Sequence, residues 1–464
     1  MSASPTQPRH TAPTSRSLAS IGLRLSDWLE RWFPDAFVLA ILAAVAVFVA
    51  GTIVSGSPTR TAQSFGAGFW DLVAFTMQVA LIIVTGYAVA ISPPVHAVIR
   101  WMAAIPKSGR GAVAFVALFS MLSSLLSWSF SLIFSGLLAR EVAGRVRGVD
   151  YRALGAAAYL GLGSVWAFGL SSSAALIMAA PASLPDSIEA ISGVIPLNET
   201  LGLWQSFVVG AVVVGMSIAI SYFSAPDAAS ARTMETMGVP PLVAPADRTT
   251  AETPGEWLEY SPILSIFVGV LGAIFLASEV ATRGFAILLD LNHYVFAFLM
   301  AAVLLHWRPR SFVRAVAAAL PSVGGVLVQY PIYAGIVGMM TGSGLSERLA
   351  EFFVAISSVH TFPVVVGIYS AFLGFFVPSA GGKWLIEAPY ILEAAKSLNQ
   401  NLGWVVQTYN ATEALANLIH PFWMLPLIGI LGLKARDIVG YSMLQFIVHV
   451  PVVLLLVWLL NYTF

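Results

Sequence analysis

The sequence predicts an all-α polytopic membrane protein, and two observations support that fold class. Of the 464 residues, 58% are hydrophobic and only 10% are charged, whereas ordinary soluble domains have about 25% charged residues. Several apolar runs reach about 20 residues, the length of a helix that crosses ~30 Å of hydrocarbon. These runs are 36–54, 72–91, 201–222, 258–278, 287–305 and 437–460.

The composition also excludes several classes of function. The formal net charge is zero, which argues against nucleic acid as a partner. The absence of cysteine excludes disulfides, thiolate chemistry and cysteine-based metal sites. The sequence contains no Walker-type glycine-rich loop, no HExxH and no GxSxG motif, so we expect neither an ATP-driven pump nor an enzyme.

Polar stretches divide the chain into two halves. Residues 1–16 are rich in Pro, Ser and Thr and predict a disordered tail, with no signal peptide. Residues 17–33 predict an amphipathic helix at the membrane surface. The proline-rich stretch 225–257 is the expected cytoplasmic linker between a first transmembrane repeat, 34–224, and a second one, 258–464.

The distribution of Lys and Arg predicts the topology, because cytoplasmic loops carry an excess of these residues. Loops 92–111 and 140–152 are both basic, so both are expected inside, and 112–139 must enter the membrane and return as a re-entrant hairpin. A second hairpin, 362–389, is expected to enter from outside. The result is about nine membrane-crossing helices plus two re-entrant hairpins, with the N-terminus cytoplasmic.

The order of these elements predicts an internal repeat. A shift of 251 residues places the first hairpin tip, 127–131, on 378–382, and 153–181 on 404–432. Because the second copy starts on the opposite side, the repeat is inverted, as in many secondary transporters. Chance alignment of apolar segments is the alternative.

Each half has two segments in which polar or small residues interrupt an apolar run. They are 127–131 and 168–174 in the first half, and 378–383 and 407–421 in the second. Irregular backbone at membrane depth is tolerated where it lines a cavity. Helix N-termini there suit a carboxylate, and free carbonyls suit sodium. Serines that only bond their own helix backbone are the alternative for the serine clusters.

Three charged residues lie well inside the apolar segments: Lys383, Glu387 and Glu413. A carboxylate at the bilayer centre costs roughly 2.5–3.5 kcal/mol on insertion scales, so such residues are functional candidates. Lys383 and Glu387 are four residues apart, which predicts a salt bridge on one helical face. A pair that only neutralises itself is the alternative, as is a structural ion pair for Glu413.

Polar residues accompany Glu413 at helical spacing. Asn410, Glu413, Asn417 and His420 follow intervals of 3, 4 and 3 residues, so they would share one face of a continuous helix. His420 precedes a proline, and a helix cap is the alternative for it.

Several ordered motifs carry a family resemblance over about residues 30–460. They include "RWFPDAFVLAI", "LAREVAGRV", "FFVPSAGGKWLIEAP" and "HPFWMLPLIGILGL". The chain resembles the bacterial short-chain fatty acid transporter family, within the ion-transporter superfamily of inverted-repeat secondary carriers. The resemblance implies uptake of acetoacetate- or butyrate-like monocarboxylates by proton or sodium symport. The positions that match the family's pattern are Gln78, Trp166, Gly169, Ser171, Ser173, Gln329, Ser379, Gly381, Gly382, Trp384, Glu413, Asn417, Pro421 and Trp423.

The chain departs from the family's pattern at both hairpin tips. Residues 127–131 read Ser-Trp-Ser-Phe-Ser where the family has Asn-Trp-Gly-Phe-Gly. Lys383 and Glu387 stand where the family has His and Gln, Ala380 replaces a Gly, and His420 replaces a Gln. These departures leave a more polar anion, a dicarboxylate or an amino-acyl conjugate, as an alternative substrate, and a passive anion channel as an alternative function.

The sequence therefore predicts a carrier that binds a small carboxylate and lies in a lipid bilayer, with Na⁺ or H⁺ as coupling ion and no other cofactor. The oligomeric state is open, and a homo-oligomer is one option. Substrate contacts are expected from Ser127, Ser129, Ser131, Trp166, Ser379, Gly381, Gly382, Lys383, Glu387, Asn417 and His420, and coupling-ion contacts from Ser171, Ser173, Asn410 and Glu413.

Overall fold

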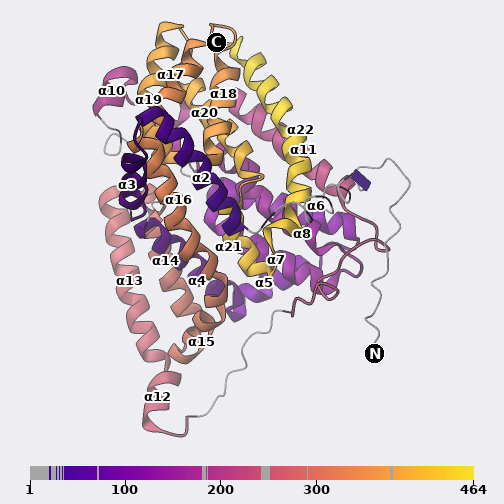
Figure 1. The fold of residues 1–464 in the computed structure, drawn as a ribbon. Helices are drawn as coiled ribbons and strands as arrows, with labels where there is room; N and C mark the ends of the chain where they lie inside the picture. The colour runs from indigo at the N-terminus through magenta and orange to yellow at the C-terminus, as the bar shows by residue number, and fades with distance from the viewer. Residues whose placement is uncertain are drawn as a thin grey trace.

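The computed structural model describes residues 20, 21, 24, 28, 31, 34, 36–70, 73–179, 184, 186–241, 251–289, 291–376 and 380–464. Across these residues the chain is helical and contains no strand, which confirms the all-α prediction (Figure 1). The disordered tail predicted at 1–16, most of the surface helix predicted at 17–33, and Ser379 lie outside the described residues.

The helices follow one another along the chain, and the long connection 225–253 separates the two halves. The first half contains α2 (Ala36–Ser55), α3 (Pro58–Gly68), α4 (Val73–Ile91), α5 (Pro93–Ala103), α6 (Gly109–Leu126), α7 (Trp128–Arg145), α8 (Tyr151–Leu160), α9 (Ser173–Ala179), α10 (Asp186–Ser192) and α11 (Trp204–Ser224). The second half contains α12 (Pro254–Tyr260), α13 (Pro262–Arg283), α14 (Leu291–His306), α15 (Pro309–Ala319), α16 (Gly324–Gly342), α17 (Leu345–Ala355), α18 (Phe362–Phe376), α19 (Ala380–Ser397), α20 (Leu402–Asn417), α21 (Pro421–Leu431) and α22 (Ala435–Asn461).

The predicted apolar runs form helices with nearly the expected bounds. The run 437–460 lies in α22, and the run 36–54 lies in α2. Within the described part of the chain, five helices are long and apolar enough to cross a membrane, or up to eight spans if each of three bent pairs counts as one. The chain is therefore a multi-pass helical membrane protein; the count of nine crossings stays a prediction.

Local sequence signals explain where many helices begin. Proline occupies the first helical turn of α3, α13 and α21, where its missing N–H would have no partner in any case. Ser57 caps α3 by accepting the backbone N–H of Arg60, and Ser261 caps α13 by accepting that of Ile263.

The helix bounds of the two halves correspond under the predicted shift of 251 residues. Adding 251 to the bounds of α3 gives 309–319, which are the bounds of α15, and adding it to those of α4 gives 324–342, which are the bounds of α16. The bounds of these two helix pairs agree with the predicted shift, while the repeat as a whole and its inverted relation across the bilayer stay predictions.

The two ends of the helix bundle contain different sets of elements. In Figure 1, α10, α17 and the C-terminus lie at one end, and α5, α12 and α15 lie at the opposite end. Charge counting predicts the first set outside and the second set inside. The described start of the expected linker packs on the bundle, because Asp150 accepts the backbone N–H of Arg232 at 3.0 Å and Arg110 pairs with Asp227 at 2.9 Å.

The two predicted hairpins pack differently. Helices α6 and α7 fold back on each other around Ser127, and the Ser131 hydroxyl donates to the Ser120 carbonyl at 2.7 Å. Helix α18 instead packs mainly against α20, while α19 packs against α9, α10, α17 and α20. Helices α18 and α19 therefore pack less closely against each other than α6 and α7 do, and other helices pack beside them.

Candidate functional site

The crossing that contains α8 and α9 breaks at the centre of the protein. A π-helical turn, Gly161–Val165, and a 3-10 turn, Trp166–Phe168, separate α8 from α9. The Gly161 N–H donates to the Ser120 hydroxyl at 2.9 Å, and a Cβ at Gly161 would collide with the Ser120 carbonyl. The backbone of this break therefore lies directly against the backbone of α6. Such π-helical turns often occur at functional sites.

Hydroxyl groups of the first half hold this break against the hairpin tip. Ser171 donates to the Ser124 carbonyl at 2.9 Å and accepts the Trp128 N–H at 2.8 Å. Ser127 caps α7 by accepting the Phe130 N–H at 3.3 Å. The hydrogen bonds described for Ser127, Ser131 and Ser171 thus go to backbone groups. Ser129 lies in α7, and its side chain is outside what the structure describes.

The broken crossing also contacts the second half. The Asn410 side chain on α20 donates to the Ser172 hydroxyl. A Cβ at Gly381 would lie 3.4 Å from the Ser173 Cβ, so the first turns of α9 and α19 are adjacent. Gly381 was predicted to contact the substrate, and Ser173 and Asn410 the coupling ion; the structure places these three residues near one another. Gly382 lies in the same first turn of α19.

A buried ion pair lies next to this junction. The Lys383 ammonium is 3.6 Å from the Glu413 carboxylate, and these side chains are 1% and 3% exposed. The ammonium also donates to the Ser370 carbonyl at 2.9 Å and lies 4.8 Å from the centre of the Tyr409 ring, a cation–π distance. The chain thus surrounds one ammonium with a carboxylate, a carbonyl and an aromatic face.

The predicted salt bridge between Lys383 and Glu387 is wrong. Lys383 pairs with Glu413 from another helix, while Glu387, 2% exposed, accepts the Tyr409 hydroxyl. Tyr409 contacts both residues: its ring centre lies 4.8 Å from the Lys383 ammonium, and its hydroxyl donates to Glu387. The spacing within α19 alone could not reveal that residues of α20 contact Lys383 and Glu387.

The predicted shared face on one continuous helix is confirmed for three residues and wrong for the fourth. Asn410, Glu413 and Asn417 lie on α20, whose residues Gly403–Asn417 are all buried. The helix ends at Asn417, so His420 is not on it. His420 instead caps α21, as the alternative stated: it accepts the Phe422 N–H at 3.1 Å, and its Nε2 donates to the Phe375 carbonyl at 2.7 Å.

Sequence reasoning missed Tyr409 and Ser370, which contact the charged residues directly. Tyr409 precedes Glu413 by four residues, so the same helical spacing could have placed it on the charged face. Ser370 acts through its backbone carbonyl, for which a sequence gives no signal. Trp166, predicted as a wall, is 3% exposed and lies in the 3-10 turn.

Several buried polar atoms around α20 have no hydrogen-bond partner. Because the great majority of buried polar atoms in proteins are paired, these atoms indicate where a ligand, ion or water can bind. No group of three or more acidic or histidine side chains that could hold a metal ion occurs among the described residues. The unpartnered atoms around α20 are Trp384 Nε1, Trp404 Nε1, Gln407 Oε1, Thr408 Oγ1 and Asn410 Oδ1, and Glu413 Oε2 has only its ion pair with Lys383.

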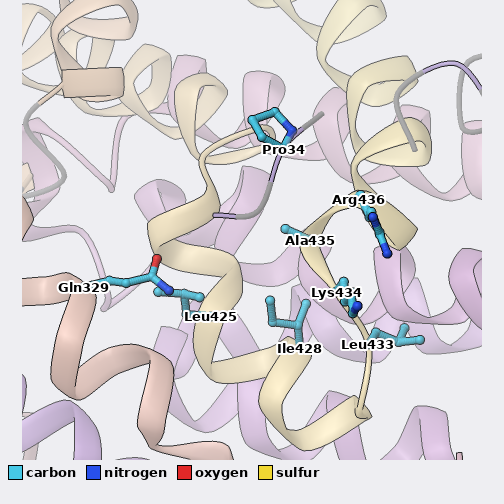
Figure 2. A pocket seen from close by; sticks show the side chains of 8 residues that line it. All are labelled: Pro34, Gln329, Leu425, Ile428, Leu433, Lys434, Ala435 and Arg436. Atoms are coloured by element: carbon cyan, nitrogen blue, oxygen red, sulfur yellow. The ribbon is translucent and has the colours of Figure 1, made fainter. Parts of the chain in front are cut away.

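Two cavities lie beside α21. One of about 200 Å³ is lined by aromatic and apolar side chains, among them Tyr333, Phe375 and Phe376, together with His420. The other, of about 330 Å³, contains Gln329 on one wall and Lys434 and Arg436 on the opposite one, as Figure 2 shows.

Comparisons with known proteins identify the family. The family model described as "Short chain fatty acid transporter" matches residues 17–460. A "Putative short-chain fatty acid transporter" of Escherichia coli (strain K12) is 37% identical over 425 residues, covering 90% of this chain and 94% of that protein. A protein of the same description from Haemophilus influenzae is 33% identical over 443 residues, covering 92% and 96%.

Two solved structures are also similar over most of the chain. The YdaH transporter of Alcanivorax borkumensis is 16% identical with a TM-score of 0.44, and 92% of this chain and 98% of that one are covered. MtrF of Neisseria gonorrhoeae, described among antimetabolite efflux pumps, is 16% identical with a TM-score of 0.41, and 93% and 97% are covered. The family match over residues 17–460 and the two sequence relatives confirm the resemblance seen in the sequence: this chain belongs to the short-chain fatty acid transporter family.

Proposed function

We propose that this chain is a secondary carrier that moves a short-chain monocarboxylate across the bacterial inner membrane together with a proton. Its family is one of transporters, not of enzymes. One observation supports the finer proposal most directly: Lys383 and Glu413 form an ion pair at 3.6 Å, buried between helices α19 and α20.

Charge balance at this pair explains how substrate and proton would be coupled. A substrate carboxylate that binds the Lys383 ammonium competes with Glu413 for it. Two carboxylates about 4 Å apart repel each other by ~4 kcal/mol at an effective dielectric constant of 20. Binding is therefore far more favourable when Glu413 takes up a proton, so substrate and proton bind together.

Gly374 allows α18 to pack closely against the Lys383–Glu413 pair. A Cβ at position 374 would lie 3.2 Å from the Glu413 Cγ and 3.6 Å from the Lys383 ammonium. The glycine thus lets α18 approach the pair closely, so that protein groups surround both charges. A low-dielectric environment strengthens the competition between two carboxylates for one ammonium.

The count of buried cations favours a monocarboxylate over a dicarboxylate. Among the described residues, Arg152 and Lys383 are the buried Lys and Arg side chains. Arg152 is already paired with Asp150 at 2.9 Å, which leaves one ammonium for one carboxylate. The apolar cavity next to His420 would suit a short hydrocarbon chain.

Uptake of acetoacetate into liposomes that contain the purified chain tests the proposal. We expect accumulation above the external concentration when the lumen is alkaline, and loss of accumulation when the pH gradient is collapsed, after subtraction of protein-free liposomes. Accumulation that requires a sodium gradient would replace the proton by Na⁺, held by the unpaired oxygens of α20. Equilibration without accumulation would indicate a passive channel instead.

A further inference from the structure

The cavity at the start of α22 is separate from the charged pair and has a different chemistry. Its lining comes from Pro34, α16, α21, the connection that contains Leu433 and Lys434, and the first turn of α22, and its volume is about 330 Å³. None of its lining residues belongs to the Lys383–Glu413 cluster. It lies at the α22 terminus far from the C-terminal end of the chain.

Positive charge dominates one wall of this cavity. Lys434 and Arg436 lie at the N-terminus of a 27-residue helix, where the helix dipole and free N–H groups favour an anion. Neither of these side chains forms an ion pair with a described residue. The neighbouring Asp437 accepts the Lys434 backbone N–H at 2.7 Å, so two positive charges and one negative charge leave a net charge of +1.

A buried amide faces this wall from the other side. Gln329 is only 7% exposed, and its Oε1 has no hydrogen-bond partner. Figure 2 shows its side chain directed toward Leu425, across the cavity from Lys434. The unpartnered Oε1 is an acceptor and does not attract an anion, but the amide also carries two N–H donors, which can bond an oxygen at the far end of a ligand whose carboxylate binds Lys434 and Arg436.

Apolar side chains occupy the space between the amide and the cations. Leu425 and Ile428 of α21 lie between them, and Leu433 lies beside Lys434 (Figure 2). A cavity with cationic and amide groups at its edges and leucine and isoleucine in its wall suits a small anion with a short hydrocarbon chain.

We propose that this cavity is a second binding site for a short-chain monocarboxylate, at the Lys434 end of the carrier. The carboxylate binds Lys434 and Arg436, the hydrocarbon chain contacts Leu425 and Ile428, and the amide of Gln329 lies at the far end of the hydrocarbon chain. The identity of the ligand rests on the proposed function, whereas the site itself rests on this cavity. Helix α21 begins at the break beside His420. The length of this helix would therefore separate the second site from the Lys383–Glu413 pair.

Equilibrium binding of radiolabelled butyrate to the full-length chain, purified in zwitterionic detergent, tests the proposal. We expect two sites per chain in the natural protein and one in K434Q/R436Q, whose lost site is weakened about tenfold or more, the effect of removing a charge-assisted hydrogen bond. Q329L should weaken the same site less than K434Q/R436Q does, because Gln329 lies on the opposite wall. K107Q replaces another exposed basic residue and should bind as the natural protein does.

Each other outcome has a defined meaning. Unchanged butyrate binding in K434Q/R436Q, or an equal loss in K107Q, overturns the second site. If butyrate occupies the Lys434-dependent site in phosphatidylcholine nanodiscs but phosphatidylglycerol displaces it, a lipid phosphate is the occupant and the proposed ligand is wrong. If the Lys434-dependent site still binds butyrate while K383M transports normally, the proposed function is wrong and the second site is supported. A natural protein that binds no butyrate contradicts both.

Discussion

The two broken regions of this protein use their polar residues in opposite ways. At the α6–α7 tip, hydroxyl groups of Ser127, Ser131 and Ser171 bond backbone N–H and carbonyl groups. Beside α19 and α20, Lys383 and Glu413 form a buried ion pair, and the Thr408 Oγ1 and Asn410 Oδ1 have no hydrogen-bond partner. The first arrangement holds helices in place through backbone hydrogen bonds, whereas the second places a buried charge pair beside unpartnered oxygens.

This difference indicates where ligand chemistry is located. A buried ion pair is weak evidence for stability, because desolvation can cost more than the attraction returns. Charged residues inside membrane proteins are therefore rare and mark ligand or ion pathways. We interpret the first region as the support and the second as the site, and four substitutions test that division, from the largest expected effect to the smallest.

Removal of the ammonium should have the largest effect. K383M leaves Glu413 buried without its cation, so we expect loss of detectable uptake and a destabilisation of about 3–5 kcal/mol, as for other broken buried pairs. The double variant K383M/E413Q removes both charges and should recover most of the thermal stability without recovering uptake. Normal uptake by K383M, measured in liposomes beside its melting temperature, would remove this lysine from the site.

Neutralisation of Glu413 should leave substrate binding intact and remove its coupling to a proton. In E413Q no proton is needed to free Lys383, so carboxylate affinity should be independent of pH between pH 6 and 8. The natural protein should bind more tightly as pH falls, because protonation of Glu413 removes the competitor. Glu387 is the other acid near Lys383, so E387Q is the control. A pH dependence retained in E413Q and lost in E387Q would assign the proton to Glu387.

Loss of the Tyr409 hydroxyl should have an intermediate effect. Y409F keeps the ring next to Lys383 and removes one of two tyrosine donors to Glu387, the other being Tyr369, so we expect a fall in stability of about 1 kcal/mol, the net contribution of one hydrogen bond. Uptake should fall less than in K383M. An unchanged melting temperature would show that Glu387 has another partner of equal strength.

Substitution at the first region should have the smallest effect on transport. S171A removes two hydrogen bonds to the hairpin tip, so we expect a loss of stability of about 1–3 kcal/mol and an unchanged KM for acetoacetate. A KM or coupling-ion affinity that changes tenfold or more while stability is retained would make Ser171 a ligand, as the sequence predicted. The division between support and site would then be wrong.

The sequence predicted the architecture well because hydrophobic run length and proline positions are local signals. The shift of 251 residues even places α15 and α16 at their observed bounds. Lys383, Glu413 and Asn410 could be predicted as site residues because a charge or amide in an apolar run has a high cost.

The pairing within the site could not be predicted, because it depends on contacts between helices. Lys383 pairs with Glu413 and contacts the Tyr409 ring, both on α20, and the break after Asn417 places His420 at the start of α21. The cavity at Lys434 was also missed, since Gln329 is 105 positions earlier in the chain than Lys434. Only the packing of α16 against α21 brings these residues together.

The central claim is that Glu413 exchanges its ion pair for a proton when a carboxylate binds Lys383. Calorimetric titration of the purified chain with acetoacetate, in buffers that differ in ionisation enthalpy, measures this proton uptake directly. The account predicts uptake of about one proton per carboxylate bound at the central site, and none in E413Q, which still binds acetoacetate. Binding to the natural protein without proton uptake, or equal proton uptake in E413Q, would contradict it.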